Sequence, residues 1–66
     1  MGYKVRKWRN ARALSQAALA TRAGVRRPTV SDIERGVVEP QPSTIRALAR
    51  ALRVSLEELR RGPLKN

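Results

Sequence analysis

The side chains that could do chemistry in this 66-residue sequence are predominantly cationic. Fifteen Lys and Arg residues stand against five Asp and Glu residues, which gives a formal net charge of +10, and Arg far outnumbers Lys. A planar guanidinium donates paired hydrogen bonds to phosphate or to guanine, and a field of this sign attracts polyanions. The charge therefore predicts a polyanionic partner, although it predicts nothing about the fold.

The sequence contains few residues that could take part in catalysis or bind a metal ion. The sequence contains neither cysteine nor histidine, which excludes thiolate ligands, imidazole ligands and an imidazole base. No Gly-rich phosphate loop is present. Five carboxylates remain, and none lies in a recognisable catalytic motif: Asp32, Glu34, Glu39, Glu57 and Glu58. We therefore expect neither an enzyme nor a metal or cofactor site.

The length and the apolar pattern predict a single cytoplasmic domain over residues 1–66. No apolar run approaches the ~20 residues of a membrane-spanning helix. Residues 1–12 are basic and lack the apolar segment of a signal peptide. Within this domain we expect an ordered core at about 4–61 and a frayed tail at 62–66.

Apolar residues recur at helical spacing and never alternate over the length of a strand, which predicts an all-α fold. The first helix is expected at about 4–12, with Trp8 in the core. The second follows an N-cap at Ser15 and ends at Gly24. The third begins within 26–28, with a proline in its first turn, and ends at Gly36.

Two further helices complete the predicted domain. The fourth begins at residue 42 or 43 and places four apolar side chains on one face: Ile45, Leu48, Ala49 and Leu52. For the fifth, Ser55 and Glu58 predict a capping box, and Leu56 and Leu59 are expected to face inward. Five short helices with short connections indicate a compact bundle-like domain.

Residues 16–35 have the spacing of two helices joined by a tight turn. Ala20 is small enough for the helices to approach closely, and Gly24 makes the turn four residues later. Val30 and Ile33 pack the second helix of this pair back against the domain. This arrangement is typical of a helix-turn-helix motif, whose second helix is free to lie in the major groove of DNA.

The run from Leu14 to Gly36 resembles the Cro/repressor-type helix-turn-helix family, also called XRE or lambda-repressor-like. The resemblance continues through Pro40, residues 45–52 and residues 54–59, about fifty residues in all, which makes it more specific than a lone motif. It implies a compact five-helix lambda-repressor-like domain with the helix-turn-helix in the second and third helices. It also implies a partner, double-stranded DNA with a palindromic operator, bound by a dimer; the short tail predicts a weak homodimer.

The resemblance and the helical placement of side chains together assign roles to individual positions. The expected contacts to DNA bases come from Arg27, Pro28, Ser31 and Asp32. The expected contacts to DNA phosphates come from Gln16, Arg26, Thr29, Arg35, Ser43 and Thr44. The resemblance further implies that Arg9 and Glu34 form an internal ion pair between the first and third helices.

Three of these positions carry specific chemical expectations. Arg27 suits guanine O6 and N7, Pro28 offers apolar surface to a thymine methyl, and Asp32 suits cytosine N4. Asp32 is equally placed to pair with Arg35 at i, i+3. Arg26 stands where the family has a capping Ser or Thr, so the first turn of the third helix needs another partner, such as Thr29 or phosphate.

Three classes of function remain open. The first is a sequence-specific DNA regulator, most simply a repressor, in the form of a phage Cro-like protein, a restriction–modification controller or an antitoxin. The second is a protein-interaction module, for which the apolar candidates outside the core are Val37, Val38, Leu56 and Leu64. The third is non-specific nucleic-acid binding by charge alone, which predicts strong salt sensitivity. No small-molecule effector site is evident.

Overall fold

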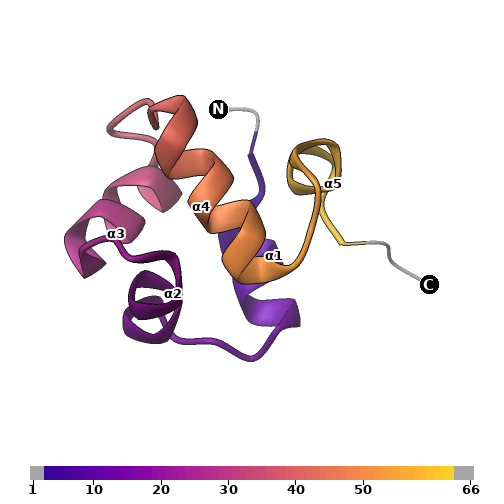
Figure 1. The fold of residues 1–66 in the computed structure, drawn as a ribbon, viewed down its shortest axis with the longest axis horizontal. Helices are drawn as coiled ribbons and strands as arrows, with labels where there is room; N and C mark the ends of the chain where they lie inside the picture. Colours follow the sequence, from indigo (N-terminus) through magenta and orange to yellow (C-terminus); the bar gives the residue numbers. More distant parts are fainter. Residues whose placement is uncertain (1–2, 64–66) are drawn as a thin grey trace.

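A computed structural model describes residues 3–63, and all the regular secondary structure in that range is α-helical. The helices are α1 (Val5–Ala11), α2 (Gln16–Ala23), α3 (Arg27–Arg35), α4 (Pro42–Leu52) and α5 (Leu56–Arg61). The predicted all-α class with five helices is confirmed. In Figure 1, α4 runs through the middle of the molecule, with α2 and α3 on one side and α5 on the other.

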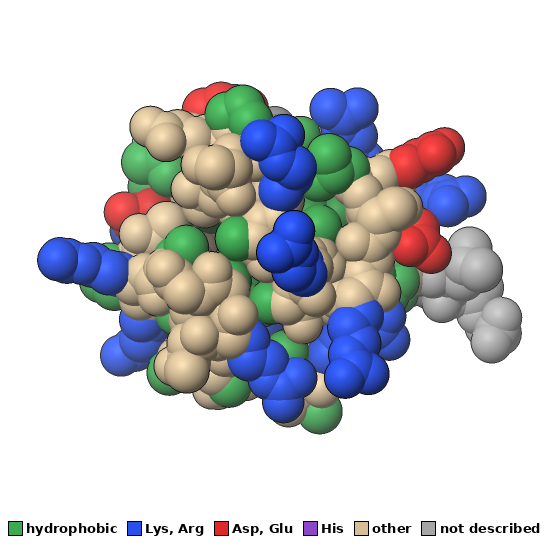
Figure 2. Space-filling model, in the orientation of Figure 1, with side chains coloured by type: hydrophobic (Ala, Val, Ile, Leu, Met, Phe, Trp, Pro, Cys, Tyr) green, Lys and Arg blue, Asp and Glu red, His purple; other side chains and the backbone are tan. Residues whose placement is uncertain are grey.

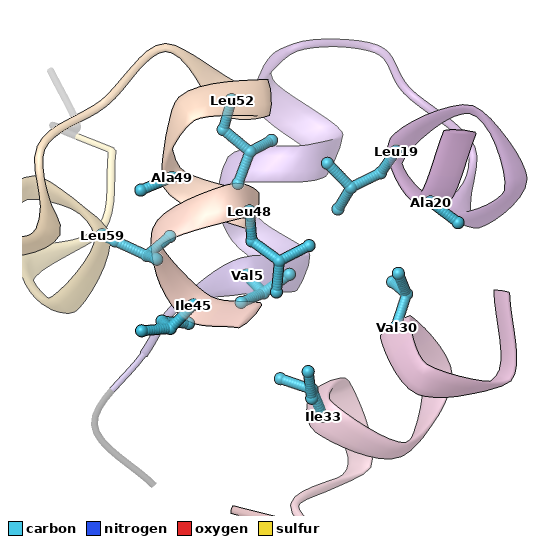
Figure 3. Packing of buried hydrophobic residues seen from close by; sticks show 10 residues of the cluster. All are labelled: Val5, Leu19, Ala20, Val30, Ile33, Ile45, Leu48, Ala49, Leu52 and Leu59. Carbon is cyan, nitrogen blue, oxygen red and sulfur yellow. The ribbon is translucent and has the colours of Figure 1, made fainter. Parts of the chain in front are cut away.

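The core lies between the five helices, where α4 packs against α1, α2 and α5, and α3 packs against α1 and α2. Figure 3 shows that every helix contributes at least one apolar side chain to this cluster. Its ten buried members are Val5, Leu19, Ala20, Val30, Ile33, Ile45, Leu48, Ala49, Leu52 and Leu59. The four residues predicted for the inner face of α4 are all among them. Each fully buried leucine stabilises the fold by about 2 kcal/mol through the transfer of apolar surface from water.

The predicted helix boundaries are confirmed where a cap or a turn residue defines them. The Ser15 hydroxyl accepts the Ala18 N–H at 3.0 Å and begins α2. Gly24 and Gly36 end α2 and α3 in the left-handed region, at φ 73° and 75°. A full capping box between Ser55 and Glu58 begins α5. Local sequence therefore determines where these helices start and stop.

The expectation that Leu56 faces inward is wrong, since Leu56 is 38% exposed while Leu59 is fully buried. The reason is where α5 is covered. The Lys4 N–H donates to the Leu59 carbonyl at 2.9 Å, and Trp8 Nε1 donates to the Glu58 carbonyl at 2.8 Å. Both contacts are made by residues 58 and 59, so Leu56, the first residue of α5, stays partly exposed. Trp8 itself packs against the edge of the core.

Arg12 links the end of α1 to the end of α4. Its Nε donates to the Leu52 carbonyl at 2.8 Å, and its guanidinium lies 5.0 Å from the centre of the Trp8 ring. A cation beside a C-terminal carbonyl satisfies an acceptor that has no partner within the helix. Beyond α5, Gly62 is buried and Pro63 half-buried, while residues 64–66 of the predicted frayed tail lie outside the described residues.

Ala13 adopts the left-handed conformation, with φ at 57°, in the connection between α1 and α2. A side chain costs roughly 1 kcal/mol there, whereas glycine has no such penalty. We therefore expect Ala13→Gly to raise the free energy of unfolding by up to about 1 kcal/mol, measured by urea denaturation. Ala17→Gly, in α2, is the control and should lower it. An equal decrease in the free energy of unfolding of both variants would show that the backbone at Ala13 is not strained.

No helix within residues 3–63 combines the length and the apolar character needed to cross a membrane.

Candidate nucleic-acid interface

The pair α2 and α3 presents one helix face to solvent. Residues 24–26 connect the two helices, and the Val25 N–H closes the turn on the Ala20 carbonyl at 3.0 Å. Ala20 is 3% exposed at the point where a larger side chain would hold the helices apart. Val30 and Ile33 are buried under α3. The opposite face of α3 is therefore left free.

The free face of α3 gathers three of the four residues predicted to contact bases. Arg27 and Pro28 are exposed in the first turn of α3, and Ser31 is half-buried one turn later. Together with Gln16 at the start of α2 they line a shallow hollow of about 360 Å³, which we call the reading hollow. The structure thus brings Gln16, a predicted phosphate contact, beside the positions predicted to read bases.

Asp32, the fourth predicted base contact, does not line the reading hollow. Its Oδ1 accepts a hydrogen bond from Arg35 Nη2 at 2.7 Å, in the i, i+3 pairing that the sequence left open. Both side chains are exposed, so the pair contributes only a few tenths of a kcal/mol to helix stability. The hydrogen bond to Asp32 also holds the side chain of Arg35, a predicted phosphate contact, on the solvent-exposed side of α3.

The remaining predicted phosphate contacts lie in the first turns of two helices, Arg26 and Thr29 at the start of α3 and Ser43 and Thr44 at the start of α4. Arg26, the N-cap of α3, makes no side-chain capping bond; its carbonyl accepts the N–H groups of Thr29 and Val30 at 3.0 and 3.3 Å. The first turn of α3 is thus closed by backbone. Ser43 is exposed and Thr44 half-buried in the first turn of α4, which contains no acidic residue. Neither lines the reading hollow.

Glu34 lies at the meeting point of α1, α2 and α3, with a side chain that is 0% exposed. Arg9 donates to it twice, from Nε to Oε2 at 2.7 Å and from Nη2 to Oε1 at 3.2 Å. Gln16 Nε2 donates to Oε1 at 3.0 Å, and Arg9 Nη1 also reaches the Leu14 carbonyl at 2.9 Å. The ion pair implied by the family resemblance is therefore present, and it also holds Gln16. We call this cluster the Glu34 junction.

Arg6 was missed as a member of the Glu34 junction by sequence reasoning. Its Nε lies 3.5 Å from Glu34 Oε1, and its side chain remains 61% exposed. The available signal was the spacing: Arg6 precedes Arg9 by three residues, so both lie on one face of α1. The junction thus consists of one carboxylate and three donors, Arg6, Arg9 and Gln16.

The environment of the Glu34 junction lowers the pKa of the Glu34 carboxyl below its ordinary value of 4.5. Burial alone raises this pKa, but hydrogen bonds from Arg9 and Gln16, the charge of Arg9 and a weaker bond from Arg6 outweigh it. The carboxylate is therefore the stable form near neutral pH, and it acts as a fixed anion that holds the three helices together.

A lowered pKa predicts a loss of stability in acid. The contribution of Glu34 is fully present above its unfolded-state pKa, near 4.5, and disappears as pH falls through the lower folded-state value. We expect the melting temperature to be level from about pH 7 to pH 5 and to fall steadily below that. The pKa of Glu58 is also lowered, by the Ser55 backbone N–H, so Glu58→Gln serves to separate the two contributions. If the melting temperature of the Glu58→Gln variant does not fall below pH 5, Glu34 is not a cause of the loss of stability in acid.

Positive charge extends well beyond α2 and α3. Figure 2 shows Lys and Arg side chains distributed across the visible face, with a few acidic groups near its edges. Within residues 3–63, no three His, Cys, Asp or Glu side chains come close enough together to hold a metal ion. The arrangement suits a long polyanion that contacts the protein at several places.

Comparison with known sequences identifies relatives over almost the whole chain. A helix-turn-helix family model matches residues 5–59. A protein described as an uncharacterised HTH-type transcriptional regulator in Mycobacterium tuberculosis, strains CDC 1551 and H37Rv, is 40% identical over 58 residues. The match covers 88% of this chain and 41% of the relative. The chain thus spans about two fifths of the length of the curated relatives it matches.

Solved structures place the fold among repressor domains. The solution structure of the DNA-binding domain of the P22 c2 repressor is similar with a TM-score of 0.79, 34% identity, and coverage of 83% of this chain and 72% of that domain. The N-terminal DNA-binding domain of SinR from Bacillus subtilis gives a TM-score of 0.78, 28% identity, and coverage of 83% and 81%.

A crystal structure of the P22 c2 repressor in complex with a synthetic operator is also similar, with a TM-score of 0.78, 34% identity and 89% coverage of both chains. The family and the fold are those of DNA-binding transcription regulators and not of enzymes. From the helix-turn-helix of α2 and α3, the family match and these neighbours, we conclude that this chain belongs to the Cro/repressor-type (XRE) helix-turn-helix family.

Proposed function

We propose that this chain is the DNA-binding domain of a repressor that recognises a palindromic operator as a weak homodimer. The observation that carries the proposal is the reading hollow, which joins an exposed Arg and Pro in the first turn of α3 to Gln16 of α2. Residues near the start of a recognition helix reach base edges first. The operator-bound state of the P22 c2 repressor, at 34% identity, supports the same use of this fold.

The proposed DNA contacts divide into contacts with bases and contacts with phosphates. In the reading hollow, Arg27 forms a bidentate pair with guanine and Pro28 contacts a thymine methyl. Ser31 lies within reach of that guanine or of that thymine. Asp32 accepts from cytosine N4 when it leaves Arg35. The proposed phosphate contacts, which fix the register of the protein on the duplex, are Gln16, Arg26, Thr29, Arg35, Ser43 and Thr44.

The experiment is selection of bound sequences from random duplex DNA, followed by titration of the enriched duplex and of a scrambled duplex at two salt concentrations. We expect a palindrome whose half-sites are about 10 base pairs apart, bound at least ~10³-fold more tightly than the scramble. Sedimentation of the complex should give two protein chains for each duplex. Failure to enrich any sequence, with affinity that collapses as salt rises, would instead mean that the +10 charge alone drives binding.

A further inference from the structure

We infer that Arg6 of α1 binds a DNA phosphate together with Gln16, so that the contact surface extends beyond the helix-turn-helix to the first helix. This inference rests on the proposed function, because it assigns a further residue to the same protein–DNA interface. Arg6 approaches the same oxygen of Glu34 that holds Gln16, a contact that sequence reasoning missed.

The geometry places the two side chains next to each other. Arg6 Nε lies 3.5 Å and Gln16 Nε2 lies 3.0 Å from Glu34 Oε1. A shared acceptor oxygen brings the two donors into one small region at the start of α2. Gln16 also lines the reading hollow with Arg27, Pro28 and Ser31. A phosphate that contacts Gln16 while α3 lies in the major groove therefore comes within reach of the Arg6 guanidinium.

The charges at the Glu34 junction leave Arg6 available. Arg9 is 14% exposed and donates to both carboxylate oxygens, so it alone matches the charge of Glu34. Arg6 adds a second positive charge at a longer distance, 3.5 Å. The junction thus carries a surplus of +1 beside a surface that we propose to face a polyanion. A surplus cation there favours phosphate as its partner.

The exposure of Arg6 argues against a mainly structural role. Its side chain is 61% exposed, and exposed ion pairs contribute little to stability. The guanidinium retains donors beyond Nε, and a solvated side chain can turn from Glu34 to a phosphate without disturbing the core. Arg9, by contrast, is fixed between Glu34 and the Leu14 carbonyl.

The test compares Arg6→Ala with Lys7→Ala, a neighbouring exposed cation on α1 that instead lines a hollow with Arg61 and Gly62 next to α5. Each substitution removes one positive charge, so the two variants differ only in where it is lost. Affinity for one fixed 20-base-pair duplex is measured at several salt concentrations. Arg6→Ala should reduce the slope of log K against log salt by about 0.9 for each protein chain bound, Lys7→Ala should leave it close to wild type, and Arg6→Lys should restore it.

The melting temperature of both alanine variants should match the wild type, which a structural role for Arg6 would not allow. Equal slopes for Arg6→Ala and Lys7→Ala would overturn the phosphate contact, whether or not the wild type prefers a particular sequence. A slope change specific to Arg6, in a wild type that prefers no sequence, would uphold the contact while the proposed repressor function fails. A wild type that binds no duplex at all would overturn both.

Discussion

Replacing Glu34 with alanine is expected to lower the free energy of unfolding by about 3 kcal/mol, because it removes one partner of a buried ion pair. The Glu34 side chain is fully buried, and Arg9 is 14% exposed. Without the carboxylate, Arg9 keeps its charge in a poorly hydrated place, and Gln16 loses the acceptor that orients its amide. In a domain of this size the loss corresponds to a fall in melting temperature on the order of 15 °C.

The matched control is Asp32→Ala, which removes a carboxylate two residues away on the same helix. Asp32 is 37% exposed and pairs with an Arg35 that is 59% exposed, so its loss should cost no more than about 0.5 kcal/mol. Both variants are measured by thermal and urea denaturation. Similar melting temperatures for the two variants would show that the Glu34 junction does not hold the helices together. Glu34→Gln keeps the shape of the side chain and should fall between them.

Arg27→Ala is expected to weaken binding to the selected operator by about 1–3 kcal/mol, roughly 5- to 150-fold, and to relax the preference at one base pair. Arg27 is exposed at the first position of α3, and it lines the reading hollow beside Gln16 and Pro28. A guanidinium there pairs with guanine O6 and N7, and alanine leaves those acceptors without a partner.

Titration against the operator and against duplexes altered at the preferred guanine separates two roles for Arg27. A base contact predicts that the variant binds the operator and the altered duplex about equally well. A uniform loss on every duplex would assign Arg27 to a phosphate instead. Arg22→Ala is the charge-matched control, because Arg22 is exposed on α2 but does not line the reading hollow. It should cost affinity without changing the base preference.

The sequence predicts most of this fold because its helix boundaries depend on local signals. Ser15 as an N-cap, Gly24 and Gly36 in the left-handed region, and the Ser55–Glu58 capping box all act within a few residues of the chain. Apolar spacing adds the inner faces of α3 and α4. Leu56 was misplaced because periodicity describes a face of a helix but not how far along the helix its neighbours reach.

The candidate site was predictable in part, through the resemblance to a family of known fold. The positions that the resemblance gives for Gln16, Arg27 and Pro28, and the position that helical placement gives for Ser31, fall around one hollow in the structure. Contacts specific to this chain were not predictable, because they depend on side chains that are distant in sequence. The approach of Arg6 to Glu34 spans twenty-eight residues and depends on the angle at which α1 crosses α3.

The Glu34 junction has a consequence for how such regulators diverge. It holds α3 in place from the inner side, through Arg9 and Gln16, whereas Arg27 and Pro28 on the outer side are exposed and make no hydrogen bond within the described residues that positions the helix. Substitutions at exposed positions usually change stability by no more than about 0.5 kcal/mol. A paralogue can therefore acquire a new operator by exchanging residues on the outer face of α3, while the buried residues that hold the helices together stay the same. Mutations that change DNA specificity in this way cost little folding stability.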